Sequence, residues 1–248
     1  MEEKVVVEFK NVSKVYKLFK NEKQRLLSVF FRKISFKKNK AVDDVSFSVK
    51  QGESVALFGR NGAGKSTILK MITGVTYPTS GELLVDGRVS ALLELTAGFD
   101  REMTGRENIY LRGQLMGIKD KEIKKLEPGI VEFSEIGDYI DQPIRTYSSG
   151  MKAKLGFAVN ANIDPEIFIV DEALSVGDAV FKEKCLKRVT EIIEKDNVTL
   201  LFVTHSTKMA REFCNRGIVL QSGKIVCDTD IESAIEEYEK ITGIQQQP

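Results

Sequence analysis

The stretch Gly59-Arg60-Asn61-Gly62-Ala63-Gly64-Lys65-Ser66-Thr67 decides the fold of this chain. It follows the apolar run Ser54-Val55-Ala56-Leu57-Phe58 and matches the pattern G-x-x-x-x-G-K-[ST] between a buried strand and a helix. The glycines allow successive backbone N–H groups to point inward, and the following helix adds the positive end of its dipole. We therefore predict that residues 59–67, called the phosphate loop below, hold phosphate oxygens.

Each residue type of the phosphate loop has its own expected use. The Lys65 ammonium reaches the β- and γ-phosphates of a nucleotide, and the Ser66 hydroxyl binds magnesium. A glycine-rich turn without a ligand is the alternative, and the flanking strand and helix make it the weaker interpretation. The nucleotide-binding residues expected in this loop are Gly59, Asn61, Gly62, Gly64, Lys65, Ser66 and Thr67.

Two later apolar runs also end in polar residues. Ile167-Phe168-Ile169-Val170 leads into Asp171 and Glu172, and Leu200-Leu201-Phe202-Val203-Thr204 leads into His205, the only histidine. Side chains at the carboxyl ends of parallel strands face the ligand crevice. We expect Asp171 to hold magnesium through water and Glu172 to orient the attacking water or accept its proton. A lone histidine is more often structural, but this position favours a contact with the γ-phosphate.

A second helix start resembles an anion site. The signature loop Tyr147-Ser148-Ser149-Gly150-Met151 places serines and a glycine before a helix rich in Ala, Leu, Lys and Phe. The alternative is a plain helix cap. Two phosphate-binding helix starts in one chain suggest that each contacts a different nucleotide, so that two chains share two.

Composition and element order define the class. The chain is 42% hydrophobic and 29% charged, which is ordinary for a soluble domain. Its three cysteines favour reduced thiols over a disulfide or metal framework. It shows no signal sequence, and no apolar run approaches the ~20 residues that span a bilayer. Strands near 5–9, 42–49, 82–85 and 89–92 precede a helical stretch, and helices then alternate with buried strands. This order predicts an α/β fold with a mostly parallel sheet, an antiparallel β part and an inserted helical part.

The helical stretch contains expected interruptions. Helices are predicted at 106–116 and 119–133 from apolar spacings of three and four residues, with breaks at Gly117, Pro128-Gly129 and Pro143. The remaining helices are expected to start at Ser149 and near Ala179, to end at Cys214, and to cover 230–242.

Residues 17–40 form a basic insert. They hold nine Lys or Arg residues and one acid, a charge of +8 in a chain whose total is +1, so the remainder carries −7. Within residues 23–34 the apolar side chains recur on one helical face. Such a helix packs on its own domain's core, lies at a membrane surface or against a membrane partner, or, as a weaker option, contacts nucleic acid. The apolar residues of that face are Leu26, Leu27, Phe30, Phe31 and Ile34.

The phosphate loop, the signature loop, Asp171-Glu172 and His205 occur in the order and spacing of one known family. The chain resembles the nucleotide-binding subunits of ATP-binding cassette (ABC) transporters over nearly its whole length. The resemblance implies the P-loop NTPase fold of ABC ATPases in one domain at 1–242, with the basic insert at 17–40, a helical signature subdomain at 104–160 and a tail at 243–248. It also implies ATP and Mg²⁺ as ligands, and a head-to-tail dimer with ATP between the two copies.

The resemblance further assigns residue roles. Tyr16 is expected to stack on adenine, although a half-buried aromatic at a strand end is the alternative. Lys65, Glu172 and His205 are expected at the catalytic centre, and Ser66 and Asp171 at magnesium. Ser149 and Gly150 are expected at the partner's γ-phosphate. Residues 175–178 are expected to cross the dimer interface.

Two departures point to one branch of the family. The signature loop reads Tyr-Ser-Ser-Gly-Met instead of Leu-Ser-Gly-Gly-Gln, and Leu93-Glu94-Leu95-Thr96 holds no glutamine where the family usually has one. Both departures resemble ATPases that export lipid-linked teichoic acid, O-antigen or capsule, most of all the teichoic acid exporters. This implies a bacterial protein, peripheral at the cytoplasmic face of the membrane, with a permease partner and the lipid-linked polymer near 23–34. Nucleic acid is not expected; a soluble cassette ATPase acting on nucleic acid or ribosomes is the rival.

Overall fold

The computed structural model describes most of the chain. The described residues are 4–31, 36–92, 95–96, 98–171, 177–195 and 197–243, without the side chains of 27–30. The expected catalytic base Glu172, Leu93 and Glu94, and residues 175–176 of the expected interface loop lie outside this set, as do 244–248 of the expected tail.

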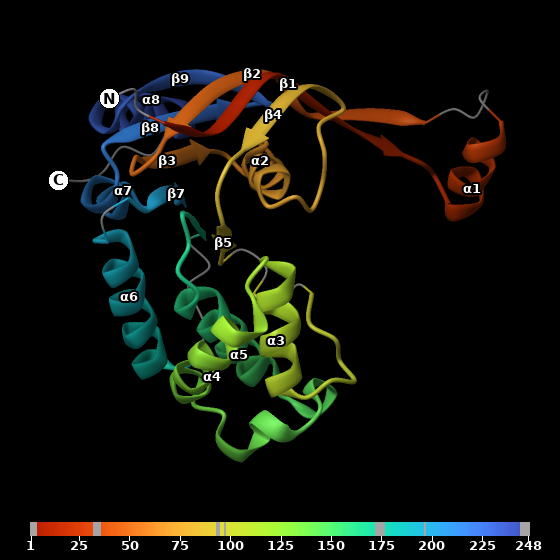
Figure 1. Ribbon diagram of the computed structural model, residues 1–248. Coiled ribbons are helices and arrows are strands. Elements are labelled where there is room, and N and C mark those ends of the chain that lie inside the picture. The colour runs from red at the N-terminus through yellow and green to blue at the C-terminus, as the bar shows by residue number, and fades with distance from the viewer. Residues whose placement is uncertain are drawn as a thin grey trace.

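The described strands form two sheets (Figure 1). The strands are β1 (Val5–Leu18), β2 (Lys37–Lys50), β3 (Ser54–Gly59), β4 (Ser80–Val85), β5 (Val89–Ala91), β6 (Ile167–Asp171), β7 (Thr199–Val203), β8 (Arg216–Gln221) and β9 (Lys224–Asp230). One sheet is antiparallel, in the order β2-β1-β4, and the other has the order β5-β6-β7-β3-β8-β9. In the second sheet only β9 runs antiparallel to its neighbour.

Some helices pack on these sheets, and others form a separate block. They are α1 (Glu22–Phe30), α2 (Lys65–Ile72), α3 (Gly105–Leu115), α4 (Asp120–Ser134), α5 (Ser149–Asn162), α6 (Ala179–Ile193), α7 (Thr207–Phe213) and α8 (Ile231–Thr242), with short 3-10 turns η1 (Gly137–Asp141) and η2 (Ile144–Thr146). The parallel sheet, the antiparallel sheet and the helices inserted between β5 and β6 confirm the predicted fold class. The exact domain boundaries stay a prediction.

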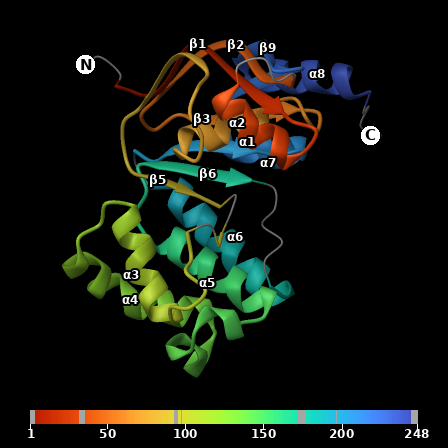
Figure 2. The same cartoon turned by 90° about the vertical axis from the view of Figure 1, so that its right-hand side faces the viewer.

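Both faces of β3 are buried, which explains its unbroken apolar sequence. Val55 and Leu57 pack with α2 and the antiparallel sheet, whereas Ala56 and Phe58 pack with α6, α7 and α8. Helix α2 therefore lies between the two sheets, on the side of β6 away from α3, α4 and α5 (Figure 2). This layering holds β3 and the start of α2, the two ends of the phosphate loop, in the centre of the protein.

The helical block, consisting of α3, α4 and α5, has its own apolar core. The predicted break at Pro128-Gly129 is wrong, because α4 continues through both residues. Proline removes one backbone hydrogen bond and strains the turn before it. Ile123 and Ile130, on either side of the proline, are buried against the neighbouring helices. This burial offsets the cost of Pro128, and the tertiary packing overrides the local signal.

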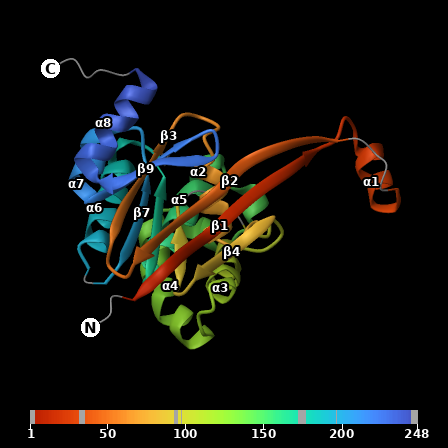
Figure 3. The ribbon, with the colours of Figure 1, turned by 90° about the horizontal axis from the view of Figure 1, so that it is seen from above.

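The basic insert extends away from the rest of the protein as the hairpin arm, consisting of the outer ends of β1 and β2 with α1 between them (Figures 1 and 3). The predicted strands at 5–9 and 42–49 are too short, because the pairing continues out to Leu18 opposite Lys37. Of the alternatives left open for this helix, packing on the domain's own core does not agree with the described residues. Leu26 is 67% exposed and Phe31 is 61% exposed, and α1 lies at the outer end of the hairpin arm, away from the parallel sheet and from the other helices.

Candidate nucleotide-binding site

Two glycines of the phosphate loop allow close backbone contacts. Gly59 has φ 150°, and a Cβ there would lie 2.5 Å from the Leu220 carbonyl oxygen. Gly64, the N-cap of α2, has φ 113°, and its Cβ would lie 2.6 Å from the Ala41 carbonyl oxygen. Any side chain would clash with backbone at both positions. The loop is thus held between the end of β8 and the inner part of β2.

The Lys65 side chain lies inside the phosphate loop. The residue is 8% exposed, and its Nζ donates hydrogen bonds to the carbonyl oxygens of Gly59 and Arg60, the latter at 3.3 Å. A further backbone bond of 3.0 Å from Gly223 N–H to the Ala63 carbonyl fixes the loop from the β8–β9 turn. Carbonyl groups at the start of the same loop therefore position the ammonium group, which supplies a fixed positive charge.

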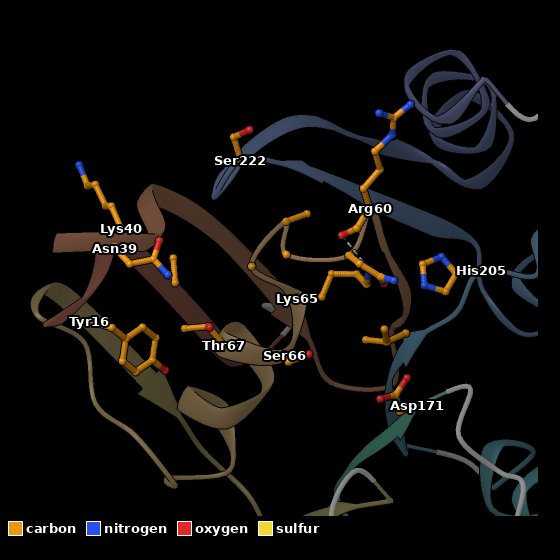
Figure 4. A pocket seen from close by; sticks show the side chains of 16 residues that line it. Tyr16, Asn39, Lys40, Arg60, Lys65, Ser66, Thr67, Asp171, His205 and Ser222 are labelled. Atoms are coloured by element: carbon orange, nitrogen blue, oxygen red, sulfur yellow. Dashed lines mark hydrogen bonds between the residues drawn. The ribbon is translucent and has the colours of Figure 1, made fainter. Parts of the chain in front are cut away.

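The phosphate loop borders a cavity of about 540 Å³ (Figure 4). Every loop residue from Arg60 to Thr67 lines it, together with Tyr16, Asp171 and His205, whereas Gly59 lies just outside at the end of β3. The size is typical of small-ligand sites, which span about 300–1,000 Å³. The structure therefore brings most of the predicted site residues to one cavity.

Strand order explains why these residues meet. Strands β6, β7 and β3 are parallel neighbours, so their carboxyl ends lie at one edge of the sheet. Asp171 ends β6, His205 follows β7, and the phosphate loop follows β3. Figure 4 shows Asp171 and His205 on one side of Lys65, and Tyr16 on the other.

Asp171 and Ser66 are suited to magnesium. Both line the cavity, and they offer a carboxylate and a hydroxyl oxygen. Mg²⁺ prefers such hard oxygen donors and keeps several waters while binding substrate phosphates. The donor chemistry therefore fits the ion, and Ser66 and Asp171 are the residues that would hold it here.

The other end of the cavity comes from the base of the hairpin arm. Tyr16 is half-buried, pairs with Asn39 across β1 and β2, and has Lys14 Nζ 5.3 Å from its ring centroid. Asn39 and Lys40 also line the cavity. Sequence reasoning missed both, because only the register of the long hairpin places Asn39 opposite Tyr16 and Lys40 opposite Val15. It also missed Ala41, Val203 and Ser222 as lining residues.

The signature loop lies apart from this cavity. Ser148 is the N-cap of α5 and accepts a 3.2 Å hydrogen bond from Met151 N–H, while Ser149 and Gly150 are the first residues of the helix. Neither Ser149 nor Gly150 lines the cavity with Lys65. The structure thus does not bring the two predicted phosphate sites together within one copy of the chain.

Tyr147, the residue before the signature serines, is held by a hydrogen bond to η1. Tyr147 is 4% exposed, and its hydroxyl donates a 2.5 Å hydrogen bond to the Tyr139 carbonyl in η1. Burial raises the pKa of the Tyr147 hydroxyl to about 12. The hydroxyl therefore stays protonated at physiological pH and remains a donor, which holds the start of α5 on the helical block.

The expected interface loop is described at its end only. Asp178 is the N-cap of α6, where its carboxylate accepts a 2.9 Å hydrogen bond from Phe181 N–H. That bond is the largest cause of a lowered pKa at Asp178. The carboxylate is also 3.5 Å from Lys154 of α5. The end of this loop is therefore tied to the helix that the signature loop begins.

Comparison with known proteins decides the family. Residues 42–175, more than half of the chain, match the family model described as ABC transporter. The chain belongs to the ABC transporter family. This cassette is 44% identical over 241 residues to the O-antigen export system ATP-binding protein RfbB of Klebsiella pneumoniae, covering 95% of this chain and 98% of that protein. It is 43% identical over 236 residues to the Teichoic acids export ATP-binding protein TagH of Staphylococcus haemolyticus, covering 95% of this chain and 89% of that protein.

Solved structures agree on the cassette fold. A dimeric ATP-binding cassette in a post-hydrolysis state, bound to ADP and Pi, superposes with a TM-score of 0.69 at 22% identity, covering 91% of this chain and 98% of that one. An ATP-binding subunit of an ABC transporter superposes with a TM-score of 0.69 at 23% identity, covering 98% of this chain and 95% of that one. Within the described residues, none of the helices of this cassette combines the length and apolarity needed to cross a bilayer.

Proposed function

We propose that this chain is the ATP-binding and ATP-hydrolysing subunit of an ABC transporter that exports a lipid-linked teichoic acid-type polymer across a bacterial cytoplasmic membrane. The observation that carries the proposal is one cavity lined by the phosphate loop, Asp171 and His205, in a chain 43% identical to a teichoic acid export ATP-binding protein over 95% of its length. The second candidate is O-antigen-type export, favoured by the 44% identity to RfbB.

The residues of the cavity divide the work of hydrolysis. Lys65 and the N–H groups of the phosphate loop bind the β- and γ-phosphates, and Tyr16 packs on the adenine at the other end. Ser66 and Asp171 would hold magnesium, which would neutralise charge on the phosphates. Glu172, which directly follows Asp171, orients the attacking water and accepts its proton.

Dimerisation completes the site. Ser149 and Gly150 do not line the cavity of their own chain, so in this proposal they bind the γ-phosphate held by a second copy. The two copies face head to tail, and each nucleotide lies between the phosphate loop of one and the signature loop of the other. ATP binding closes the dimer and hydrolysis reopens it, which drives a separate membrane permease.

In this proposal, the hairpin arm contacts the membrane surface and the permease. Leu26 and Phe31 are exposed, Lys23 lies on α1, Lys20 lies just before it, and Lys17 lies at the outer end of β1. Each Lys or Arg close to anionic lipid contributes about 1 kcal/mol of attraction. We infer that α1 lies at the cytoplasmic membrane surface beside the permease, near the lipid-linked polymer, and that the subunit is peripheral there.

The test is the isolation of a tagged Glu172→Gln chain from its native membrane in the presence of ATP. We expect a polytopic permease that is released only by detergent, together with a lipid-linked polymer. A polyol-phosphate polymer supports teichoic acid export, and a phosphate-poor glycan supports the O-antigen alternative. A double variant that also carries Lys65→Ala is the control for ATP dependence. A soluble protein partner, or nucleic acid bound in a salt-dependent way, would contradict the proposal.

A further inference from the structure

His205 is linked to a tyrosine that the proposed mechanism does not use. Its Nδ1 lies 2.7 Å from the hydroxyl oxygen of Tyr238 in α8. His205 lines the nucleotide cavity and is exposed, whereas Tyr238 is 2% exposed and does not line the cavity. The bond therefore connects a residue at the cavity to the buried side of the last described helix.

The position of the tyrosine hydroxyl is set by close packing. The Tyr238 ring stacks on Phe58 of β3, with centroids 5.0 Å apart and planes at 23°. Helix α8 lies directly on β8, because a Cβ on Gly217 would be 2.4 Å from Ala234 Cβ. Strand β3, which leads into the phosphate loop, therefore also supports the Tyr238 ring through Phe58. Such packing holds a polar group with the precision that a functional site requires.

The chemistry of phosphate decides which way this hydrogen bond runs. Phosphate oxygens at neutral pH accept hydrogen bonds, so a histidine that binds them must present an N–H. A neutral imidazole carries one N–H, and a hydrogen bond at one nitrogen selects which nitrogen holds the proton. If the Tyr238 hydroxyl donates to Nδ1 of His205, the proton is on Nε2. The contact with phosphate then falls to Nε2.

We propose that Tyr238 is a positioning residue for ATP hydrolysis: its hydroxyl donates to Nδ1 of His205 and keeps the imidazole oriented with a protonated Nε2 toward the γ-phosphate. This inference rests on the proposed function, in which His205 contacts that phosphate. Tyr238 itself touches no nucleotide and acts only through His205. Without the hydroxyl, Nδ1 loses the donor that selects the tautomer, and the other tautomer places an acceptor against the phosphate oxygens.

The first test is the kinetics of Tyr238→Phe, which keeps the ring stacked on Phe58 and removes only the hydroxyl. We expect kcat for ATP hydrolysis to fall about tenfold, the effect of one lost hydrogen bond. KM for ATP should change less than about twofold, because the contact matters most as charge develops on the γ-phosphate. Tyr110→Phe is the matched control, since it removes a 2.8 Å hydroxyl bond to Glu127 in the helical block and should leave kcat unchanged.

The second test reads the tautomer without any need for hydrolysis. His205 is the only histidine, so a histidine-labelled full chain, purified without a polyhistidine tag, gives one set of imidazole ¹⁵N signals. We expect a single dominant form with Nε2 protonated in the wild type and a mixture of tautomers in Tyr238→Phe. A purely structural tyrosine would lower stability and leave this spectrum unchanged.

A double variant guards against misfolding. In the His205→Ala background, Tyr238→Phe should have no further effect on kcat, whereas a general loss of folding would lower it again. The inference is overturned if the wild type hydrolyses ATP and Tyr238→Phe matches it in kcat, or if the histidine spectrum is the same in both. An inactive wild type would refute the proposed function instead, and the tautomer measurement would still decide the role of Tyr238.

Discussion

The base of the signature loop allows a sharp test by double mutation. Gly105, the first residue of α3, is buried beside Tyr147, and a Cβ on it would lie 2.3 Å from the Tyr147 hydroxyl oxygen and 3.0 Å from Ile140 Cδ1. The hydroxyl cannot swing aside without losing its hydrogen bond to the Tyr139 carbonyl. Gly105→Ala should therefore destabilise the folded chain by about 1–3 kcal/mol through overpacking.

The partner variant Tyr147→Phe removes that oxygen. Alone it should cost about 1 kcal/mol, because one hydrogen bond is lost while the Tyr139 carbonyl keeps its 2.9 Å bond from Gln142 N–H. In the double variant the new methyl group occupies part of the space of the missing hydroxyl. We expect the double variant to be about 1–2 kcal/mol more stable than the sum of the two single effects predicts.

The measurement is urea unfolding of the wild type, both single variants and the double variant, followed by linear extrapolation of the free energy to zero denaturant. Additive effects within about 0.5 kcal/mol would refute the packing argument. They would mean that the signature loop is not fixed by the contact between Gly105 and Tyr147.

Two further predictions concern ionisable groups. Burial raises the pKa of the Cys185 and Cys214 thiols to about 12, so we expect a thiol reagent followed by mass spectrometry to label the partly exposed Cys227 first, and the other two only when urea opens the fold. Lys184 lowers the pKa of Glu135 below its usual 4.5 through a 2.7 Å contact, so this stabilisation is complete above about pH 4.5 and is lost as the pH falls through the folded-state pKa. Glu135→Gln should therefore lower the free energy of unfolding at pH 7 by about 0.5 kcal/mol, a small effect for a partly exposed pair, and the gap from the wild type should close toward pH 3 in urea titrations; a constant gap would contradict the assignment.

The centre of the site was readable from the sequence because its determinants are local. A strand, a glycine-rich turn and a helix start follow one another between Ser54 and Thr67, and the backbone geometry of that turn depends on residues inside it. Asp171 and His205 were found by the same logic, since each ends a short apolar run. The rule that parallel strands end at one edge then placed them together without knowledge of the strand order.

Features that depend on contacts between residues far apart in the sequence could not be predicted from the sequence. Tyr238 bonds to His205 across 33 positions, and no pattern in the sequence connects them. Asn39 reaches the cavity only through its register with Tyr16 in a hairpin longer than the apolar alternation suggested. Pro128 reads as a helix break, yet burial on the rest of the helical block keeps α4 continuous. In each case tertiary contacts supply what local patterns lack.

The closing of two copies on ATP is the event on which the proposed mechanism depends. The direct measurement is the mass of the Glu172→Gln chain in solution by size-exclusion chromatography with light scattering, with and without Mg²⁺ and ATP. We expect a monomer of 27.8 kDa without ATP and twice that mass with it, and a Gly150→Asp change in the same chain should prevent dimerisation while ATP still binds. A chain that binds ATP and remains monomeric, or a dimer that tolerates Gly150→Asp, would contradict the shared-nucleotide mechanism.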